Sequence, residues 1–268
     1  MSDATRKTSV QGLFYPRECA KVKTYFREFN HTFDTMNIPS DIKSIVPRAI
    51  IVPHAGYIYS GFTANFAYRF LKQAKVKRII VIGPSHHHPF KGVSGSYYET
   101  YDTPCGQIEI DSAYLFALAK KFNIGFEPKT HEKEHSTEVQ FPFIQHYFPK
   151  TKVIELIYGD IPAKSLANLI SALLNNKDNT VVISSDLSHF HNLKEAKVLD
   201  KNCLKGVEKL DLTELEKGCK ACGLTGIQAM ILAAKHLKYS SKLLDYRTSA
   251  NVSHDTNSVV GYMSAMFY

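Results

Sequence analysis

Three short apolar segments of this chain are each followed by a turn that carries histidine. The segments span 48–52, 77–82 and 179–185, and the turns that follow them contain His54, His86 and His189. Runs of Val and Ile that end at Pro, Gly or Ser predict buried strands. In an α/β sheet, ligands gather outside the carboxyl ends of the parallel strands. The chain is therefore expected to fold around a sheet edge at which several histidines meet.

Helical stretches alternate with these strands. Helices are expected over 17–33, 63–74, 112–122, 138–147, 162–175, 193–210 and 222–237, and further strands over 152–158, 242–249 and 258–267. The spacing of the first two central strands predicts a right-handed parallel βαβ unit. Residues 93–97 and 107–110 are expected to form an antiparallel hairpin, and 130–135 a charged loop. No repeat or linker divides 1–268, so we expect an α/β fold in a single domain, with a mostly parallel or mixed central sheet flanked by helices.

Charge and hydropathy exclude several classes of function. The chain has 33 Lys and Arg against 25 Asp and Glu, a net charge of +8, but its lysines are scattered. No basic block supports nucleic-acid binding. No apolar run approaches the roughly 20 residues that a membrane-spanning helix needs. The first residues lack the apolar core of a signal peptide, so a cytoplasmic location is expected.

The five cysteines are an odd number, which argues against a disulfide framework. Cys219 and Cys222 form a C-x-x-C pair, and the absence of a second such pair argues against a zinc ribbon. Cys222 stands where a helix is expected to begin, and a helix N-terminus lowers the pKa of a thiol. It is therefore a candidate nucleophile or metal ligand, although a lone cysteine is as often a small buried apolar residue.

His54 and His86 are the best candidates for metal ligands. A single histidine after a strand is more often a loop residue or a helix cap than a ligand. Two of them in successive βα turns reverse that preference, because successive parallel strands are often neighbours. Imidazole is also the commonest metal-binding side chain. His87 and His88 are expected to orient neighbouring groups or to face solvent.

Two further pairs suggest acid–base chemistry. Asp186 and His189 lie three residues apart after a strand, and His135 and Glu138 repeat that spacing, which on a helix places both on one face. Each pair alone is weak support. Tyr57 could donate a hydrogen bond to a substrate oxygen, with packing as the simpler alternative. The chain has no G-x-G-x-x-G, Walker, G-x-S-x-G or H-E-x-x-H motif, so nucleotide binding and the common hydrolase mechanisms lose support.

Taken together, these motifs resemble one known family. The stretches that carry the resemblance are 12–16, 53–57, 83–87, 134–138, 184–189, 222–223 and 259–262. In this order they resemble the Memo family, which in prokaryotes is component B of the AmmeMemoRadiSam system. The resemblance implies a fold similar to that of class III extradiol dioxygenases, which open catechol rings with non-haem iron(II). It also implies action alongside an AMMECR-type protein and a radical SAM protein.

The resemblance assigns roles to particular residues. His54, His86 and Cys222 match the metal site of the family, and His135, Asp186 and His189 match residues that line it. From their chemistry, we take His135, Asp186 and His189 as the catalytic candidates and Tyr57, His87 and Glu138 as the candidates for substrate binding. The usual iron triad is two histidines and a carboxylate, so a cysteine departs from the dioxygenases and also admits copper or zinc. His254 is a second departure, because a small residue is usual there.

The expected function is that of a metal-dependent redox protein, most simply with iron(II), acting on a small molecule or a peptide. An adaptor that binds peptides in a vestigial pocket without turnover is the alternative, since eukaryotic relatives are described as phosphotyrosine-peptide adaptors. A zinc hydrolase, with Asp186 or Glu138 activating water, is a third and weaker hypothesis.

Overall fold

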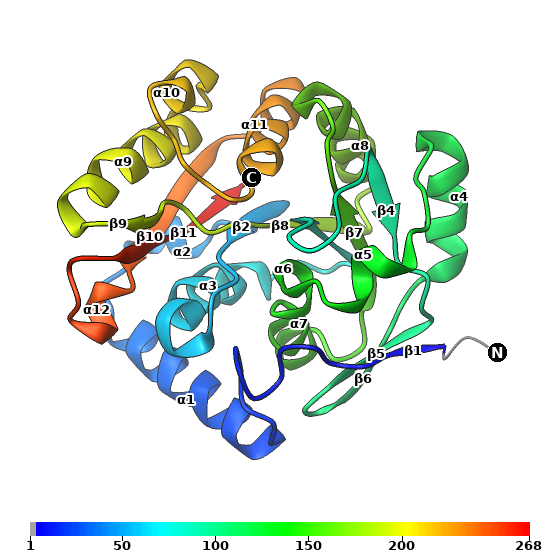
Figure 1. Ribbon diagram of the computed structural model, residues 1–268, viewed down its shortest axis with the longest axis horizontal. Coiled ribbons are helices and arrows are strands. Elements are labelled where there is room, and N and C mark those ends of the chain that lie inside the picture. Colours follow the sequence, from blue (N-terminus) through cyan, green and yellow to red (C-terminus); the bar gives the residue numbers. More distant parts are fainter. Residues whose placement is uncertain (1–3) are drawn as a thin grey trace.

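A mixed eight-stranded sheet forms the centre of the structure, a computed structural model that describes residues 4–268 (Figure 1). The strands lie in the order β10 (Ser241–Thr248), β11 (Val259–Phe267), β2 (Ala49–Val52), β8 (Asn179–Ser184), β3 (Arg78–Pro84), β7 (Lys152–Tyr158) and β4 (Val93–Gly95), and β9 (His189–His191) pairs with β11. Strands β2, β8, β3 and β7 are parallel, whereas β11 is antiparallel to both of its neighbours β10 and β2, and β4 is antiparallel to β7. The expected α/β class with a mixed sheet is confirmed.

Strand β8 lies between β2 and β3. It pairs in parallel with both, with Ile183 opposite Ile51 on one side and Val181 opposite Ile80 on the other. The sequence had suggested that β2 and β3, the two strands of the first βαβ unit, are adjacent. In the structure they are not. A strand that comes about 100 residues later in the chain separates them. All three strands are buried on both faces and are nearly continuous apolar runs, so their sequence pattern does not reveal which of them are neighbours. The three strands followed by histidine-bearing turns are consecutive in the sheet.

Helices cover both faces of the sheet (Figure 1). One face carries α4 (Ser112–Phe122), α8 (Ala163–Asn175), α9 (Leu193–Lys209) and α11 (Leu224–Leu237), and the other carries α1 (Cys19–Thr35), α3 (Tyr57–Leu71) and α7 (Phe141–Tyr147). Successive side chains of a strand point to opposite faces. Accordingly Ile80 and Ile82 pack in the first core, and Ile79 and Val81 in the second.

Several elements differ from the sequence-based expectation. Helix α3 begins at Tyr57, directly after the turn that holds His54. The expected charged loop at 130–135 contains part of α5 (Pro128–Glu132), and the expected helix 138–147 is split into α6 (His135–Glu138) and α7. The hairpin consists of β5 (Thr100–Thr103) and β6 (Gly106–Glu109), with β1 (Thr5–Arg6) beside β5, while β4 joins the main sheet. The remaining short helices are α2 (Ser40–Lys43), α10 (Leu212–Glu216) and α12 (Ala250–Ser253).

Two disulfides contradict the expectation from the odd number of cysteines. Cys19–Cys105 joins the start of α1 to the β5–β6 turn, and Cys203–Cys219 joins α9 to the segment after α10. Cys222 is the free cysteine. Parity shows only that one thiol is left over, and it does not exclude pairing among the other four. Among the residues from 4 onward, none of the helices is both long enough and apolar enough to cross a membrane.

Candidate metal centre

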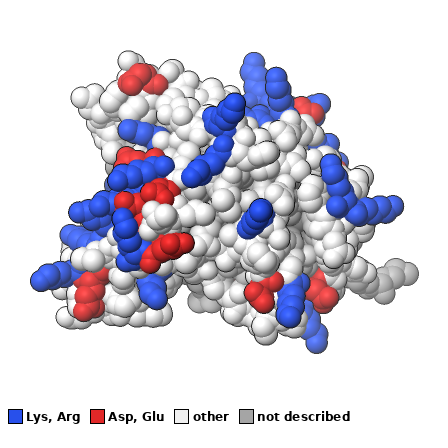
Figure 2. Space-filling model, turned by 90° about the horizontal axis from the view of Figure 1, so that it is seen from above, with Lys and Arg blue, Asp and Glu red and all other residues white. Residues whose placement is uncertain are grey.

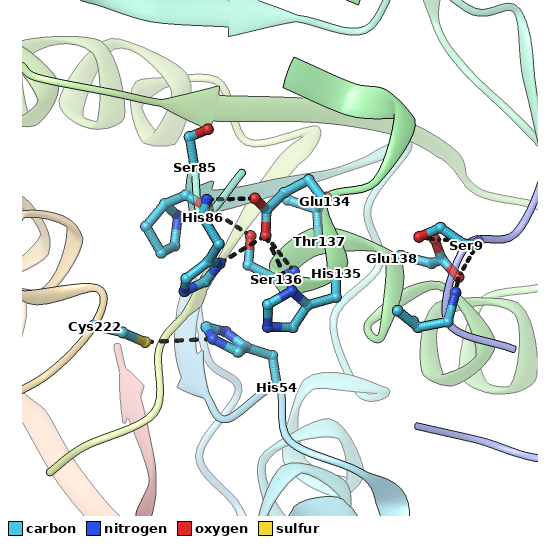
Figure 3. Close-up of polar contacts among 12 residues, drawn as sticks. Ser9, His54, Ser85, His86, Glu134, His135, Ser136, Thr137, Glu138 and Cys222 are labelled. Atoms are coloured by element: carbon cyan, nitrogen blue, oxygen red, sulfur yellow. Dashed lines mark hydrogen bonds and ion pairs between the residues drawn. The ribbon is translucent and has the colours of Figure 1, made fainter. Parts of the chain in front are cut away.

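Three side chains from distant parts of the chain bring possible metal-ligating atoms together at the carboxyl end of the sheet (Figure 3). One nitrogen each of His54 and His86 and the sulfur of Cys222 all lie within 4.8 Å of one another. His54 follows β2, His86 follows β3, and Cys222 precedes α11. The structure thus groups the three residues that the sequence nominated as ligands.

His54 is held in one tautomer by the protein. It is 2% exposed, and its Nδ1 lies 2.9 Å from Ser184 Oγ. The single hydroxyl hydrogen of Ser184 is donated to the carbonyl of Ser136 at 2.5 Å, so Ser184 Oγ must accept a hydrogen bond from His54 Nδ1–H. The unprotonated Nε2 is then directed to Cys222 Sγ, 3.3 Å away. Burial, and after it the neighbouring His86, lower the pKa of His54 to about 3, so its ring is neutral near pH 7.

His86 is oriented in the same way by Glu134. Its Nδ1 lies 2.8 Å from Glu134 Oε1, and its backbone N–H donates to Oε2 at 2.6 Å. Because a carboxylate only accepts, Nδ1 carries the hydrogen and Nε2 is left to ligate. Burial acts to raise the pKa of Glu134, but the hydrogen bonds from His86 and Ser136 outweigh it and lower the pKa to about 2. Glu134 is therefore an anion beneath the imidazole.

Cys222 does not have the activated thiol that the sequence suggested. The helix begins only at Leu224, and burial, with a contribution from Asp186, raises the pKa of the Cys222 thiol to about 12. The backbone N–H of Asp186 donates to Sγ at 3.2 Å, which partly offsets this. In the absence of a cation the group is a neutral thiol. A bound metal would supply the positive charge that favours the thiolate.

The three expected catalytic residues surround this group. The His135 ring lies against His86, with 4.5 Å between ring centroids, and burial is the main reason that its pKa falls to about 4. His189 Nδ1 lies 2.8 Å from the carbonyl of Leu187, which leaves its Nε2 as an acceptor. Asp186 Oδ1 accepts the backbone N–H of His54 at 2.8 Å, and burial raises the pKa of its carboxyl.

The three expected substrate-binding residues are placed less uniformly. His87 is exposed, 5.8 Å from the His135 ring between centroids, and so lies at the edge of the cluster. Tyr57 is 1% exposed, and its hydroxyl donates to the carbonyl of Val139. The Glu138 carboxylate points away from the centre toward Ser9 (Figure 3). The structure therefore does not bring Tyr57 or Glu138 to the cluster.

Two glycines allow the segments to approach so closely. A Cβ on Gly83 would lie 2.5 Å from Ser136 Oγ, and one on Gly223 would lie 2.6 Å from Ser185 Cβ. The first contact seats α6, with His135, against the end of β3. The second seats the start of α11, with Cys222, against the end of β8. Any larger residue at either glycine would separate the ligands.

Glu134 is a residue of the candidate site that the sequence did not single out. Its position directly before His135 in the 134–138 motif was the available signal. His86, Glu134 and His135 also form a second group whose potential ligand atoms lie within 4.8 Å of one another. That group shares His86 with the first, and Glu134 already accepts both the ring and backbone N–H of His86, which favours an orienting role for the carboxylate.

The donor set fits a divalent metal. Ligands about 2.0–2.3 Å from a tetrahedral ion lie roughly 3.3–3.7 Å apart, and the separation of His54 Nε2 from Cys222 Sγ matches that spacing. In both imidazoles an acceptor holds Nδ1, which leaves Nε2 as the nitrogen that could bind a metal. Two imidazoles and a thiolate suit iron, copper or zinc better than magnesium or calcium.

Known proteins resemble this chain over nearly its whole length. Residues 6–266 match the family model described as Memo-like protein. A "MEMO1 family protein" of Methanobrevibacter smithii is 33% identical, and one of Nitrosopumilus maritimus is 30% identical; each alignment covers 98% of this chain and 99% of the relative. The crystal structure of uncharacterized protein JW3007 from Escherichia coli K12 aligns with a TM-score of 0.53 at 13% identity, over 82% of this chain and 99% of that one. That likeness concerns the fold alone.

Proposed function

Because the chain belongs to the Memo family, we propose that it is a metal-binding redox protein that acts on a small substrate or a partner protein. His54, His86 and Cys222 would hold the metal. The observation that carries the proposal is the convergence of their donor atoms within 4.8 Å, beyond the ends of β2 and β3 and just before α11. Iron(II) is the ion we favour, and copper or zinc are the alternatives that a thiolate ligand admits.

Iron(II), when bound, would supply one-electron redox chemistry and Lewis acidity. The chain's own groups divide the remaining work. Glu134 and Ser184 fix the tautomers of the two ligating imidazoles, which keeps both Nε2 atoms directed inward. His189 has its Nδ1 hydrogen bonded to a carbonyl, so its Nε2 can accept a proton from a substrate. His135, neutral near pH 7, can act in the same way beside His86.

Metal analysis of two matched variants tests the ligand set. His86→Ala removes a proposed ligand, whereas His88→Ala removes a histidine of the same turn that lies outside the cluster. After anaerobic purification, we expect stoichiometric metal in the wild type and in His88→Ala, and loss of metal in His86→Ala. Equal metal content in the two variants would disprove the assignment, provided that circular dichroism shows both to be folded.

A second candidate, a binding protein without turnover, is favoured by one observation. Phe190, next to His189, is 79% exposed and has a positive φ of 62°, an unusual conformation for a bulky residue. An aromatic side chain held in solvent beside the centre is suited to contact a peptide. Oxygen uptake by the metal-loaded protein under reducing conditions would favour the redox function. A metal-free protein that binds peptides would favour the adaptor. An AMMECR-type protein and a radical SAM protein remain our proposed partners.

A further inference from the structure

A pocket apart from the metal centre lies among the start of α9, the end of β10 and α12. Its volume is about 390 Å³, within the size range of small-molecule sites. The lining residues are Leu193, Lys197, Tyr246, Arg247, Thr248, Ala250, Asn251, His254 and Thr256. They include His254, at which the resemblance leads us to expect a small residue. They also include two cations and no carboxylate.

Arg247 is held in place before any ligand arrives. Its guanidinium carbon lies 4.1 Å from the centre of the Phe62 ring, and its Nε donates to Asp245 at 3.0 Å. One edge and one face of the guanidinium are thus occupied. Among residues 4–268, no hydrogen bond or ion pair uses the two terminal nitrogens of Arg247, which form the fork that binds phosphate oxygens in pairs. Little side-chain entropy would be lost on binding.

Lys197 provides the net positive charge. Asp245 offsets the charge of Arg247, but Lys197 is exposed and has no ion pair among residues 4–268. The Asp200 carboxylate, which accepts the Tyr246 hydroxyl at 2.7 Å, is buried behind the wall of the pocket. An anion entering the pocket would therefore meet one unneutralised ammonium and one fixed guanidinium.

Polar groups around these cations can complete the coordination of an oxyanion. Asn251 Oδ1 accepts both the backbone N–H and the hydroxyl of Thr248, so the Asn251 amide nitrogen is left with two donors. Thr256 adds a hydroxyl and His254 an imidazole. Leu193, Ala250 and the Tyr246 ring form an apolar side, which would contact the rest of a ligand.

We propose that this pocket binds a phosphorylated small molecule, with its phosphate group on Arg247, Lys197 and Asn251. The positive charge of the whole molecule does not by itself explain such a site. On the face shown in Figure 2, Lys and Arg side chains are spread over the surface, and many stand beside Asp or Glu. What distinguishes the pocket is its concavity, the preorganised fork and the absence of a lining carboxylate. The pocket is connected to the metal centre through the backbone. Ser249, which follows the lining residue Thr248, accepts a hydrogen bond from the backbone N–H of Val260, and Val260 pairs with His189.

Titration of the full-length protein with phenyl phosphate tests the proposal. We expect saturable shifts of the backbone amide signals of Thr248 and Asn251 in ¹⁵N spectra, and none with phenol, which lacks the anionic group. Lys197→Ala and Arg247→Ala should each weaken binding by about tenfold, because each removes a charge-assisted contact.

Lys194→Ala is the matched control. Lys194 is an exposed lysine of the same helix that does not line the pocket, and its removal should leave the affinity unchanged. An equal loss in Lys194→Ala and Lys197→Ala would reveal only general attraction to a basic surface and would overturn the proposal. Shifts that do not saturate, or saturable shifts confined to amides around His54 and His86, would also overturn it.

Discussion

The carboxylate of Glu138 fastens the N-terminal segment to the helix that carries His135. It accepts hydrogen bonds from Arg6 Nη1, Ser9 N and Oγ, Val10 N and the Tyr15 hydroxyl, at 2.7–3.0 Å. Glu138 and Arg6 are 1% and 3% exposed. Through these bonds the segment is positioned so that Phe14 lies against His135, with 5.0 Å between ring centroids. Glu138→Gln tests how much of the structure depends on this carboxylate.

The cost of Glu138→Gln follows from the kind of partners that it has. Each carboxylate oxygen accepts from a backbone N–H, and one also accepts from the Arg6 guanidinium. Whichever way the glutamine amide turns, its NH₂ must face a group that can only donate. The substitution also leaves Arg6 buried without its counter-charge. Breaking a buried ion pair from one side typically costs about 3–5 kcal/mol, and we expect that loss in the free energy of unfolding.

Urea denaturation at pH 7 measures the loss, with Glu132→Gln, an exposed carboxylate on α5, as the control. A loss below about 1 kcal/mol would refute the reasoning, since that is the range of an exposed pair. The pH dependence provides a second check. Burial acts to raise the pKa of Glu138, but Arg6 and the N–H donors lower it overall. The contribution of Glu138 to stability is thus complete above the pKa of about 4.3 that it has in the unfolded chain, and it is lost as the pH falls through the lower pKa of the folded state. The free energies of unfolding of the wild type and of Glu138→Gln should therefore converge in acid.

Three further predictions concern the centre and the disulfides. Glu134→Gln should weaken metal binding by about 10–100-fold, because an amide holds the His86 ring less firmly than a carboxylate does. Competition with a chelator measures the affinity, and an unchanged affinity would contradict the orienting role of Glu134. Because the Cys222 thiol has a pKa of about 12, metal binding at pH 8 should release about one proton per ion, measurable with an indicator dye, and no release would mean that the thiol does not ligate. Replacing Cys203 and Cys219, which are 16 residues apart, by Ala should lower the free energy of unfolding by about 3 kcal/mol, and a loss under about 1 kcal/mol would contradict this.

The parts of the fold that the sequence predicted are those in which burial follows a simple period. The apolar strands β2, β3, β7 and β8 and the helices α8 and α9 appear within a few residues of their expected bounds. The segment 130–135 was mistaken for a loop because its residues are charged or polar. In the structure His131 is fully buried, and its Nδ1 lies 2.5 Å from Glu155 Oε2. Burial is the main reason that the pKa of His131 falls to about 3 and that of Glu155 rises to about 8. Because burial of such a polar pair leaves no periodic pattern of apolar residues in the sequence, the helix could not be recognised from it.

The sequence nominated the three residues that the structure groups together, but not the residues that hold them. His54 and His86 could be nominated because each follows a strand, and Cys222 because it precedes a helix. The order of strands in the sheet, with β8 between β2 and β3, was not encoded in any local motif. The expected role of Glu138 in substrate binding is not supported, because spacing places a residue on a helix face and does not reveal that the N-terminal segment covers that face.

The contacts of the three candidate ligands imply that the protein orders these side chains whether or not a metal is bound. His54 is fixed by Ser184, and His86 by Glu134, through bonds that use only Nδ1 and the backbone. Cys222 Sγ is in turn positioned by the Asp186 N–H. None of these contacts needs a metal ion, so the conformational entropy of the three ligands is already lost on folding. The ion would then meet a rigid site, which favours tight binding and geometric selectivity over adaptability.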